Sequence, residues 1–229
     1  MPPKRQTAPY WVQGSIVSLL YRSAPGVVLK HWLAQGMRYM GWAEVVAKLL
    51  LEALFFLCFL IALRAAGIAL VSSMVFAVFL AHTANCLVNG HCVALLRYFG
   101  VAVRTKDELL AYPAQIRDRL ARRKSVIAVA LFGSASRGRV TETSDIDVRV
   151  VARDGCLPGL AAAFLVVRER FLALINRFPI DIFVVTRSRG LEKLRSDEPP
   201  VVLFDHEGFF RRSCPTVLDY EHVVANSMK

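Results

Sequence analysis

The sequence predicts a small α+β domain with a mixed sheet and flanking helices, preceded by a hairpin of two apolar helices. Two observations support this prediction. Apolar residues make up 55% of the 229-residue chain, and they concentrate between positions 49 and 88. After Thr105 the pattern becomes helix, strand, strand, helix, strand, which is typical of a compact domain of mixed class.

Composition divides the chain into three segments, residues 1–48, 49–104 and 105–229. The first combines basic residues with tryptophan and tyrosine, as interfacial membrane segments do; an irregular basic tail is the alternative. The second holds the apolar hairpin and a connection, and the third holds the α+β domain. The net charge of +11 suits polyanionic partners such as nucleic acid, nucleotide phosphates or an anionic membrane leaflet.

The apolar runs 49–63 and 65–88 predict a transmembrane or membrane-embedded helical hairpin. The second run, and the first when extended back to residue 45, are long enough to cross a bilayer. Basic residues flank both ends, whereas the tip carries only Arg64, so the positive-inside rule places both termini and the α+β domain in the cytoplasm. A buried helical pair in a soluble core and re-entrant insertion from one side remain alternatives.

The five cysteines include no CxxC pair, which favours reduced thiols over a disulfide framework. His82, Cys86, His91 and Cys92 are close enough in sequence for a metal site. Their spacing fits no standard zinc pattern, however, and cysteines are common on apolar helix faces. Together with Asn85, the two histidines lie where the second apolar run ends, and polar groups there are either functional or helix caps. The sequence assigns no role to any of them.

The α+β domain begins with a capping box, Thr105 to Glu108, which predicts a helix to about residue 124. Pro113 is expected to break or kink that helix. A continuous apolar run then predicts a buried strand over 126–132. The remaining predicted elements are a strand over 145–152, a helix over 160–176, a strand over 179–186 and a short strand over 201–204.

Three aspartates stand on the predicted strands. Strand alternation places Asp145, Asp147 and Arg149 on one face. Two carboxylates held so close repel each other unless a cation lies between them, and Mg²⁺ binds such ligands together with water and phosphate oxygens. Asp181 is an isolated acid in an otherwise apolar strand, and joining the first two around a pair of metal ions accounts for it.

The turn after the first strand carries Gly133 and Ser134. Glycine permits a sharp turn and a close approach to a ligand, and the following residues are expected to begin a short helix. Amides at that helix start, with the Ser134 hydroxyl, would form a phosphate cradle. Arg137 and Arg139 would neutralise the outer phosphates of a triphosphate, and Ser144 would cap or orient the turn into the aspartates.

Gly133-Ser134, ten intervening residues, Asp145-x-Asp147 and the later Asp181 resemble the signature of the polymerase-β-like nucleotidyltransferase superfamily, especially its minimal branch. The resemblance covers about residues 105–205 and implies a palm-like mixed sheet. It implies that the first two aspartates ligate two Mg²⁺ ions, with Mn²⁺ as the alternative. Asp181 would bind the acceptor-side ion and assist deprotonation of the acceptor hydroxyl, while Gly133 and Ser134 would grip the β and γ phosphates. The implied reaction is in-line attack of a hydroxyl on the α-phosphorus of an NTP, with release of pyrophosphate.

Together, the resemblance and the hairpin predict a membrane-anchored nucleotidyltransferase that uses an NTP, most simply ATP. The expected partners are the NTP, membrane lipids and a hydroxyl acceptor that is a membrane protein or a lipid-linked molecule. Nucleic acid is less favoured, because nothing in the chain resembles domains that hold a DNA duplex or a tRNA. Two alternatives stay open: an inactive nucleotide-binding or scaffold protein at the membrane, and an antitoxin-like module that adenylylates a partner protein.

Overall fold

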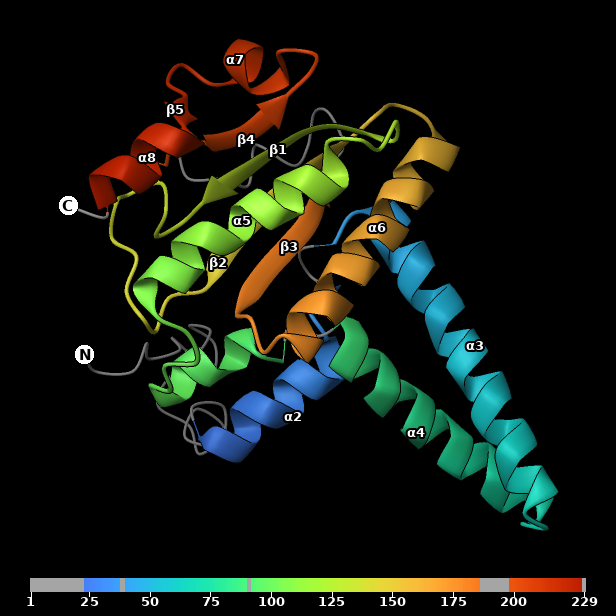
Figure 1. Ribbon diagram of the computed structural model, residues 1–229. Coiled ribbons are helices and arrows are strands. Elements are labelled where there is room, and N and C mark those ends of the chain that lie inside the picture. The colour runs from blue at the N-terminus through green and yellow to red at the C-terminus, as the bar shows by residue number, and fades with distance from the viewer. Residues whose placement is uncertain (1–22, 38–39, 90–91, 186–197, 228–229) are drawn as a thin grey trace, which may run out of the picture.

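The structure is a computed structural model that describes residues 23–37, 40–89, 92–185 and 198–227. It consists of a helical hairpin that leads into a mixed α+β domain (Figure 1). The α-helices are α2 (Ala24–Ala34), α3 (Trp42–Ala65), α4 (Leu70–Asn89), α5 (Lys106–Leu120), α6 (Cys156–Ile175), α7 (Phe209–Ser213) and α8 (Tyr220–Ser227). A short 3-10 helix, η3, covers Ala94–Phe99, and the strands are β1 (Val126–Phe132), β2 (Ile146–Ala152), β3 (Ile180–Val185), β4 (Val201–Asp205) and β5 (Leu218–Asp219).

The strands form one open five-stranded sheet in the order β3-β2-β1-β4-β5. β1 is antiparallel to both of its neighbours, whereas β3 runs parallel to β2 and β5 runs parallel to β4. Helix α6 connects β2 to β3, as a parallel pair requires. The predicted mixed α+β class and the predicted order of elements after Thr105 are therefore confirmed.

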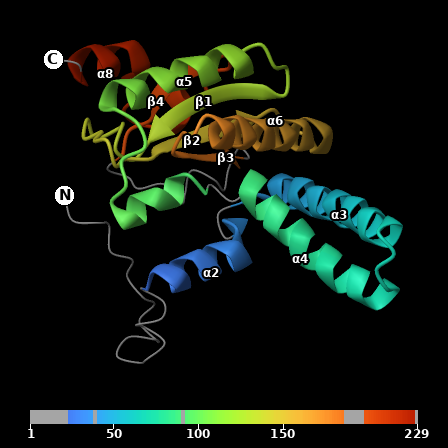
Figure 2. The ribbon, with the colours of Figure 1, turned by 60° about the horizontal axis from the view of Figure 1, so that its bottom comes forward.

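Apolar side chains cover β1 on both faces, so all seven of its residues are buried. The larger core packs β1, β2 and β3 against α5 and α6, through residues such as Val129, Val148 and Ile182. A smaller cluster on the opposite face includes Phe132 and the α7 residue Phe210. Figure 2 shows α5 and α6 along one side of the sheet. The opposite face of β2 and β3 carries the polar side chains considered below.

Helix α5 begins with the predicted capping box. The Thr105 hydroxyl accepts a hydrogen bond from Glu108 N at 3.3 Å, and the Glu108 carboxylate accepts one from Thr105 N at 2.9 Å. The prediction was a break or a kink at Pro113; the helix continues through this residue to Leu120, so it does not break there. Pro113 and its neighbour Tyr112 are buried against the sheet, and this burial offsets the lost backbone hydrogen bond.

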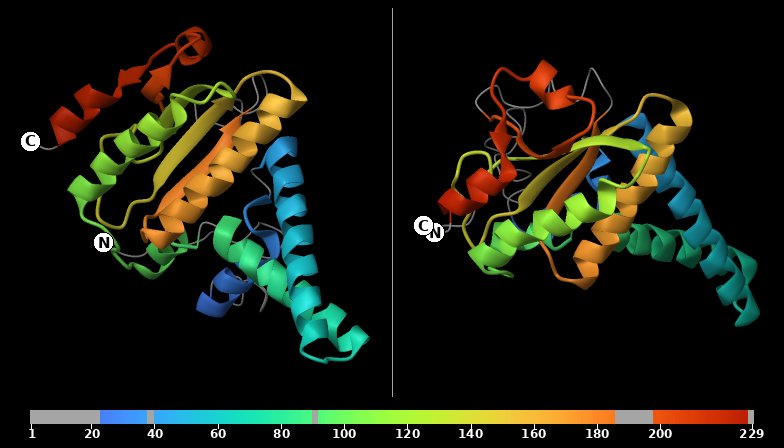
Figure 3. Two further views of the ribbon diagram at one scale, coloured as in Figure 1. Left: turned by 45° about the vertical axis from the view of Figure 1, so that its right-hand side comes forward. Right: turned by 45° about the horizontal axis from the view of Figure 1, so that its top comes forward.

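Helices α3 and α4 form the predicted hairpin, which projects away from the sheet in both views of Figure 3. Gly67, with φ +79°, lets the chain turn: its N–H donates to Arg64 O at 3.0 Å and Ile68 N donates to Leu63 O at 3.2 Å. This pair of bonds is the Schellman arrangement that ends many helices at a glycine. Both helices are long and apolar enough to cross a membrane, judged by length and composition alone.

The base of the hairpin packs on α6 and on the outer edge of β3. Glu44 of α3 and Arg170 of α6 form an ion pair at 2.5 Å, and their side chains are only 1% and 2% exposed. The same carboxylate accepts a hydrogen bond from Val184 N at 3.0 Å, and Arg170 Nε donates to Ile182 O at 3.1 Å. The hairpin and α6 therefore supply the hydrogen-bond partners that a neighbouring strand would give to these two edge residues.

Candidate active site

The three predicted aspartates come together at one end of the β2–β3 pair. Asp147 lies on β2 and faces Asp181 of β3 in the parallel register, while Asp145 immediately precedes β2. One carboxylate oxygen of each residue lies within 4.8 Å of the others. Asp145 is buried and the other two are half-buried. Parallel pairing places the strand-borne acids side by side, and the turn before β2 adds the third.

The turn after β1 lies against this acidic cluster. Gly133 has φ +68°, and a Cβ atom at this position would overlap the Asp147 carboxylate. Glycine is therefore required both by the backbone conformation and by the close approach. Ser134 Oγ donates to Asp145 O at 3.4 Å, which joins the turn to the residue before β2. The expected short helix is not formed: residues 133–138 are consecutive turns, with Arg139 N donating to Ser134 O at 2.9 Å.

The other predicted nucleotide-binding residues surround this turn. Arg137 forms an ion pair with Glu198, and the adjacent Ser136 hydroxyl donates to Pro199 O at 2.7 Å. Arg139 is exposed. Ser144 Oγ accepts a hydrogen bond from Thr141 N at 3.0 Å and so stabilises the turn into the aspartates. Arg137 and Arg139 thus belong to the loop that begins at Gly133, and Ser144 immediately precedes Asp145; contact of these residues with a nucleotide stays a prediction.

Arg149 is a further residue of this site to which the sequence assigned no role. Its guanidinium donates to Asp181 O at 3.2 Å and lies 5.1 Å from the centre of the Phe183 ring. It therefore links β2 to the residue of β3 that carries the third carboxylate. The alternation of side chains along β2 predicted that Arg149 lies on the same face as Asp145 and Asp147. The sequence does not show that the Asp181 carbonyl of β3 lies within reach of Arg149.

The donor set of the cluster suits a hard divalent cation. Three carboxylates converge, and oxygen is the ligand that Mg²⁺ and Mn²⁺ prefer. Carboxylates this close repel one another, and a divalent ion removes that repulsion. The glycine turn places backbone rather than side-chain atoms beside the Asp147 carboxylate.

The polar residues near the end of the second apolar run, to which the sequence assigned no role, fall into two groups in the structure. His82 Nδ1 lies 3.1 Å from a Glu52 carboxylate oxygen, and its backbone carbonyl accepts a bond from the Gln35 amide at 3.0 Å. Asn85 donates to Lys48 O at 3.1 Å and to Glu52. His82 and Asn85 therefore hold α2, α3 and α4 together. His91 lies outside the described residues.

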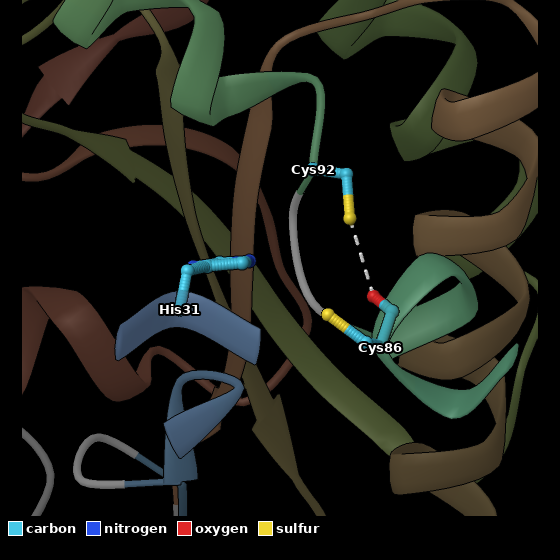
Figure 4. Close-up of side chains that lie close together, drawn as sticks. All are labelled: His31, Cys86 and Cys92. Atoms are coloured by element: carbon cyan, nitrogen blue, oxygen red, sulfur yellow. Dashed lines mark hydrogen bonds between the residues drawn. The ribbon is translucent and has the colours of Figure 1, made fainter. Parts of the chain in front are cut away.

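Cys86 and Cys92 meet a different histidine, His31 of α2 (Figure 4). One imidazole nitrogen and the two sulfurs lie within 4.8 Å of one another. Burial lowers the pKa of His31 to about 4, so the ring is neutral at pH 7. His31 lies far from the two cysteines in the sequence. No sequence motif or residue spacing predicted that they would meet.

Residues 113–185 match the family model described as nucleotidyltransferase domain. The matched range contains Gly133, Ser134 and all three clustered aspartates, and members of this family usually use a divalent metal. A search of curated proteins and a search of solved structures each found no match. Residues 1–112 and 186–229 lie outside the matched range. The protein is thus an enzyme, a transferase with a nucleotidyltransferase domain at residues 113–185.

Proposed function

We propose that the protein is a membrane-anchored enzyme that transfers a nucleoside monophosphate from an NTP to a hydroxyl acceptor at the cytoplasmic face of a membrane. The observation that carries the transfer reaction is the convergence of Asp145, Asp147 and Asp181 within 4.8 Å beside the Gly133 turn. This arrangement lies inside the matched nucleotidyltransferase domain.

In this reaction the residues have distinct roles. Asp145, Asp147 and Asp181 would hold two Mg²⁺ ions, or Mn²⁺, which when bound would neutralise phosphate charge and lower the pKa of the acceptor hydroxyl. Asp181, at the edge strand, would assist removal of the hydroxyl proton. The Gly133-Ser134 turn would bind the β and γ phosphates through backbone N–H groups and the Ser134 hydroxyl. Arg137 and Arg139 of the same loop, with Ser144, would complete the nucleotide site; ATP is the simplest donor.

The exposed surface of the hairpin supports membrane anchoring. In the most apolar stretch of each helix, only 11% of α3 and 28% of α4 is buried inside the protein. Ile61 is 68% exposed and Val71 74% exposed, and they are accompanied by Leu54, Leu57, Val75 and Phe79. A continuous apolar surface of this kind is unfavourable in water and favourable in lipid. It argues against the alternative of a helical pair buried in a soluble core.

The attachment of the hairpin to the domain supports an acceptor at the membrane. Glu44 at the start of α3 binds Val184 of β3, the strand that carries Asp181. A membrane-embedded hairpin would therefore hold the acidic cluster close to the lipid surface. A membrane protein or a lipid-linked molecule fits this position better than a nucleic acid. The presence of all three acids disfavours the inactive scaffold, while a partner protein as acceptor is distinguished by the experiment below.

The test is incubation of membranes containing the protein with α-³²P-labelled ATP, CTP, GTP and UTP in turn, with Mg²⁺. We expect label to be retained on a protein band or in the lipid extract, and that fraction identifies the acceptor class. Asp145→Asn or Asp147→Asn should lower the labelling rate about 1,000-fold, because each removes several kcal/mol of charge stabilisation.

The matched control is Asp118→Asn, because Asp118 is an exposed acid on α5 that contacts Arg117 and lies outside the cluster. This variant should label at the wild-type rate. Equal labelling by the wild type and the two cluster variants would contradict the proposed reaction. Label confined to one soluble partner protein would favour the adenylylating module over a membrane acceptor.

A further inference from the structure

His31, Cys86 and Cys92 form a second group of potential metal ligands, which shares no residue with the cluster of aspartates. His31 comes from α2, Cys86 from the last turns of α4, and Cys92 from the segment that follows α4. In Figure 4 the imidazole and the two thiols point into the same space. Segments that are distant in sequence thus place one nitrogen and two sulfurs within 4.8 Å of one another.

The hydrogen bonding of this cluster is incomplete. Nε2 of His31 is buried and has no hydrogen-bond partner among the described residues. A buried polar group without a partner costs about 1–3 kcal/mol, so such a group usually has a ligand or a water. Cys86 is only 6% exposed, and Cys92 Sγ donates to the Cys86 carbonyl at 3.3 Å, a contact that brings the two cysteines together.

We propose that His31, Cys86 and Cys92 bind a zinc ion at the junction of α2 with the base of the hairpin. Thiolate and imidazole are the ligands that zinc prefers, whereas Mg²⁺ and Mn²⁺ prefer the carboxylates of the active site. Zinc bonds of about 2.3 Å to sulfur and about 2.0 Å to nitrogen place ligand atoms somewhat under 4 Å apart in a tetrahedron. The observed separations require only small side-chain adjustments, and a fourth position remains for water or another side chain.

The net charge of the site also favours zinc. Two thiolates balance the two positive charges of Zn²⁺, and the imidazole is neutral. The bound unit therefore carries no net charge, and its burial has a small desolvation free energy. The thiol protons would be released to solvent when the ion binds. The charged groups near His31 are one acid, Asp181, and two bases, Lys48 and Lys30.

Zinc at this position would act structurally. It would join α2 to the end of α4, in a region where Lys48 of α3 already binds Gln35 at the end of α2. Because the same hairpin base contacts β3, the ion would stabilise the support of the strand that carries Asp181. This role does not depend on nucleotide transfer.

The test is the metal content of the full chain, purified in detergent and dialysed, measured by inductively coupled plasma mass spectrometry. We expect about one zinc per chain. Cobalt substitution should produce thiolate-to-cobalt charge-transfer absorption. Cys86→Ser, Cys92→Ser and His31→Gln should each weaken zinc affinity by about 100-fold or more and remove or shift that absorption. Cys58→Ser and Cys156→Ser, at exposed cysteines, are the matched controls and should retain both signals.

Several results would overturn the proposal. These are a wild-type protein without stoichiometric zinc, a cobalt form without thiolate absorption, or a Cys86–Cys92 disulfide in freshly purified protein. Zinc lost from Asp145→Asn but kept in the cysteine variants would assign the ion to the active site instead. Since no nucleotide is present in these measurements, their failure is distinct from failure of the proposed transfer reaction.

Discussion

Gly133 lies where the turn after β1 meets the Asp147 carboxylate. Two demands meet at this residue: a positive φ of +68° and no room for a Cβ beside the carboxylate. Gly138, in the same loop, has a similar φ of +62° but has open space around the position of a Cβ. Substitutions at the two glycines therefore separate the effect of backbone strain from the effect of displacing the Asp147 carboxylate.

We expect Gly133→Ala to lower nucleotidyl transfer about 100-fold, because the methyl group pushes Asp147 out of the cluster. Gly138→Ala should cost only the backbone strain, about 1–2 kcal/mol of folding stability, with little effect on the rate. The measurement is the rate of NTP turnover at saturating Mg²⁺, compared with the melting temperature of each variant. Equal activities in the two variants would refute a special role for the Gly133–Asp147 contact.

At the scale of elements, β3 is an edge strand that carries a site residue and is held from both sides. Arg149 of β2 binds Asp181 O on the inner side, and Glu44 and Arg170 bind the outer edge at Val184 and Ile182. Breaking one partner of a buried ion pair leaves the other charge without compensation, which is costly. The position of Asp181 should therefore depend on the hairpin base.

Glu44→Gln is expected to destabilise the folded protein by about 3 kcal/mol, because it removes the negative charge from the buried ion pair with Arg170. Thermal unfolding of the full chain in detergent measures the effect. Glu221→Gln is the control, since Glu221 forms an exposed ion pair with Arg117 at 2.7 Å and its loss should cost less than about 1 kcal/mol. Replacing both partners, in Glu44→Leu with Arg170→Met, should restore part of the loss. Similar melting temperatures for Glu44→Gln and Glu221→Gln would contradict this interpretation.

At the scale of the whole molecule, the hairpin is both an apolar projection and part of the support of the domain. A chain that began at Thr105 would lack Glu44 and also Asn89, whose side chain accepts a bond from Arg170 at 3.1 Å. Truncation at this point would therefore remove contacts that support β3 as well as the apolar surface of the hairpin. Substitution on the outward surface of the hairpin separates the two roles better than truncation.

Leu54→Arg and Leu57→Arg should together release the protein from membranes into the soluble fraction. Each places a charge near the centre of α3, at a cost of about 3 kcal/mol in the apolar core of a bilayer. Fractionation followed by alkaline extraction measures the distribution. Leu157→Arg, at an exposed leucine of α6, is the control and should leave the protein in the membrane fraction. An unchanged distribution for the hairpin variant would contradict anchoring by this hairpin.

Much of the candidate site was predictable because its signals are local. The alternation of β2 and the isolated acid of β3 identified Asp147 and Asp181, and the glycine turn was recognisable from its position after an apolar strand. The prediction was wrong where tertiary contacts override local preference. Pro113 remains inside α5, where it and its neighbour Tyr112 are buried. The loop after Gly133 forms turns instead of a helix, with Arg137 and Ser136 bound to Glu198 and Pro199.

The sequence by itself determined the class of the domain, the order of its elements and the residues of its acidic cluster. Periodicity and residue type depend only on neighbours in the chain, and they carry this information. Only the tertiary structure decided which partners support the site. The contacts of Glu44 with Val184 and of Arg170 with Ile182 use backbone groups at a sheet edge, and His31 meets Cys86 and Cys92 through helix packing. Such contacts join residues far apart in sequence, so no local pattern reveals them before the chain is folded.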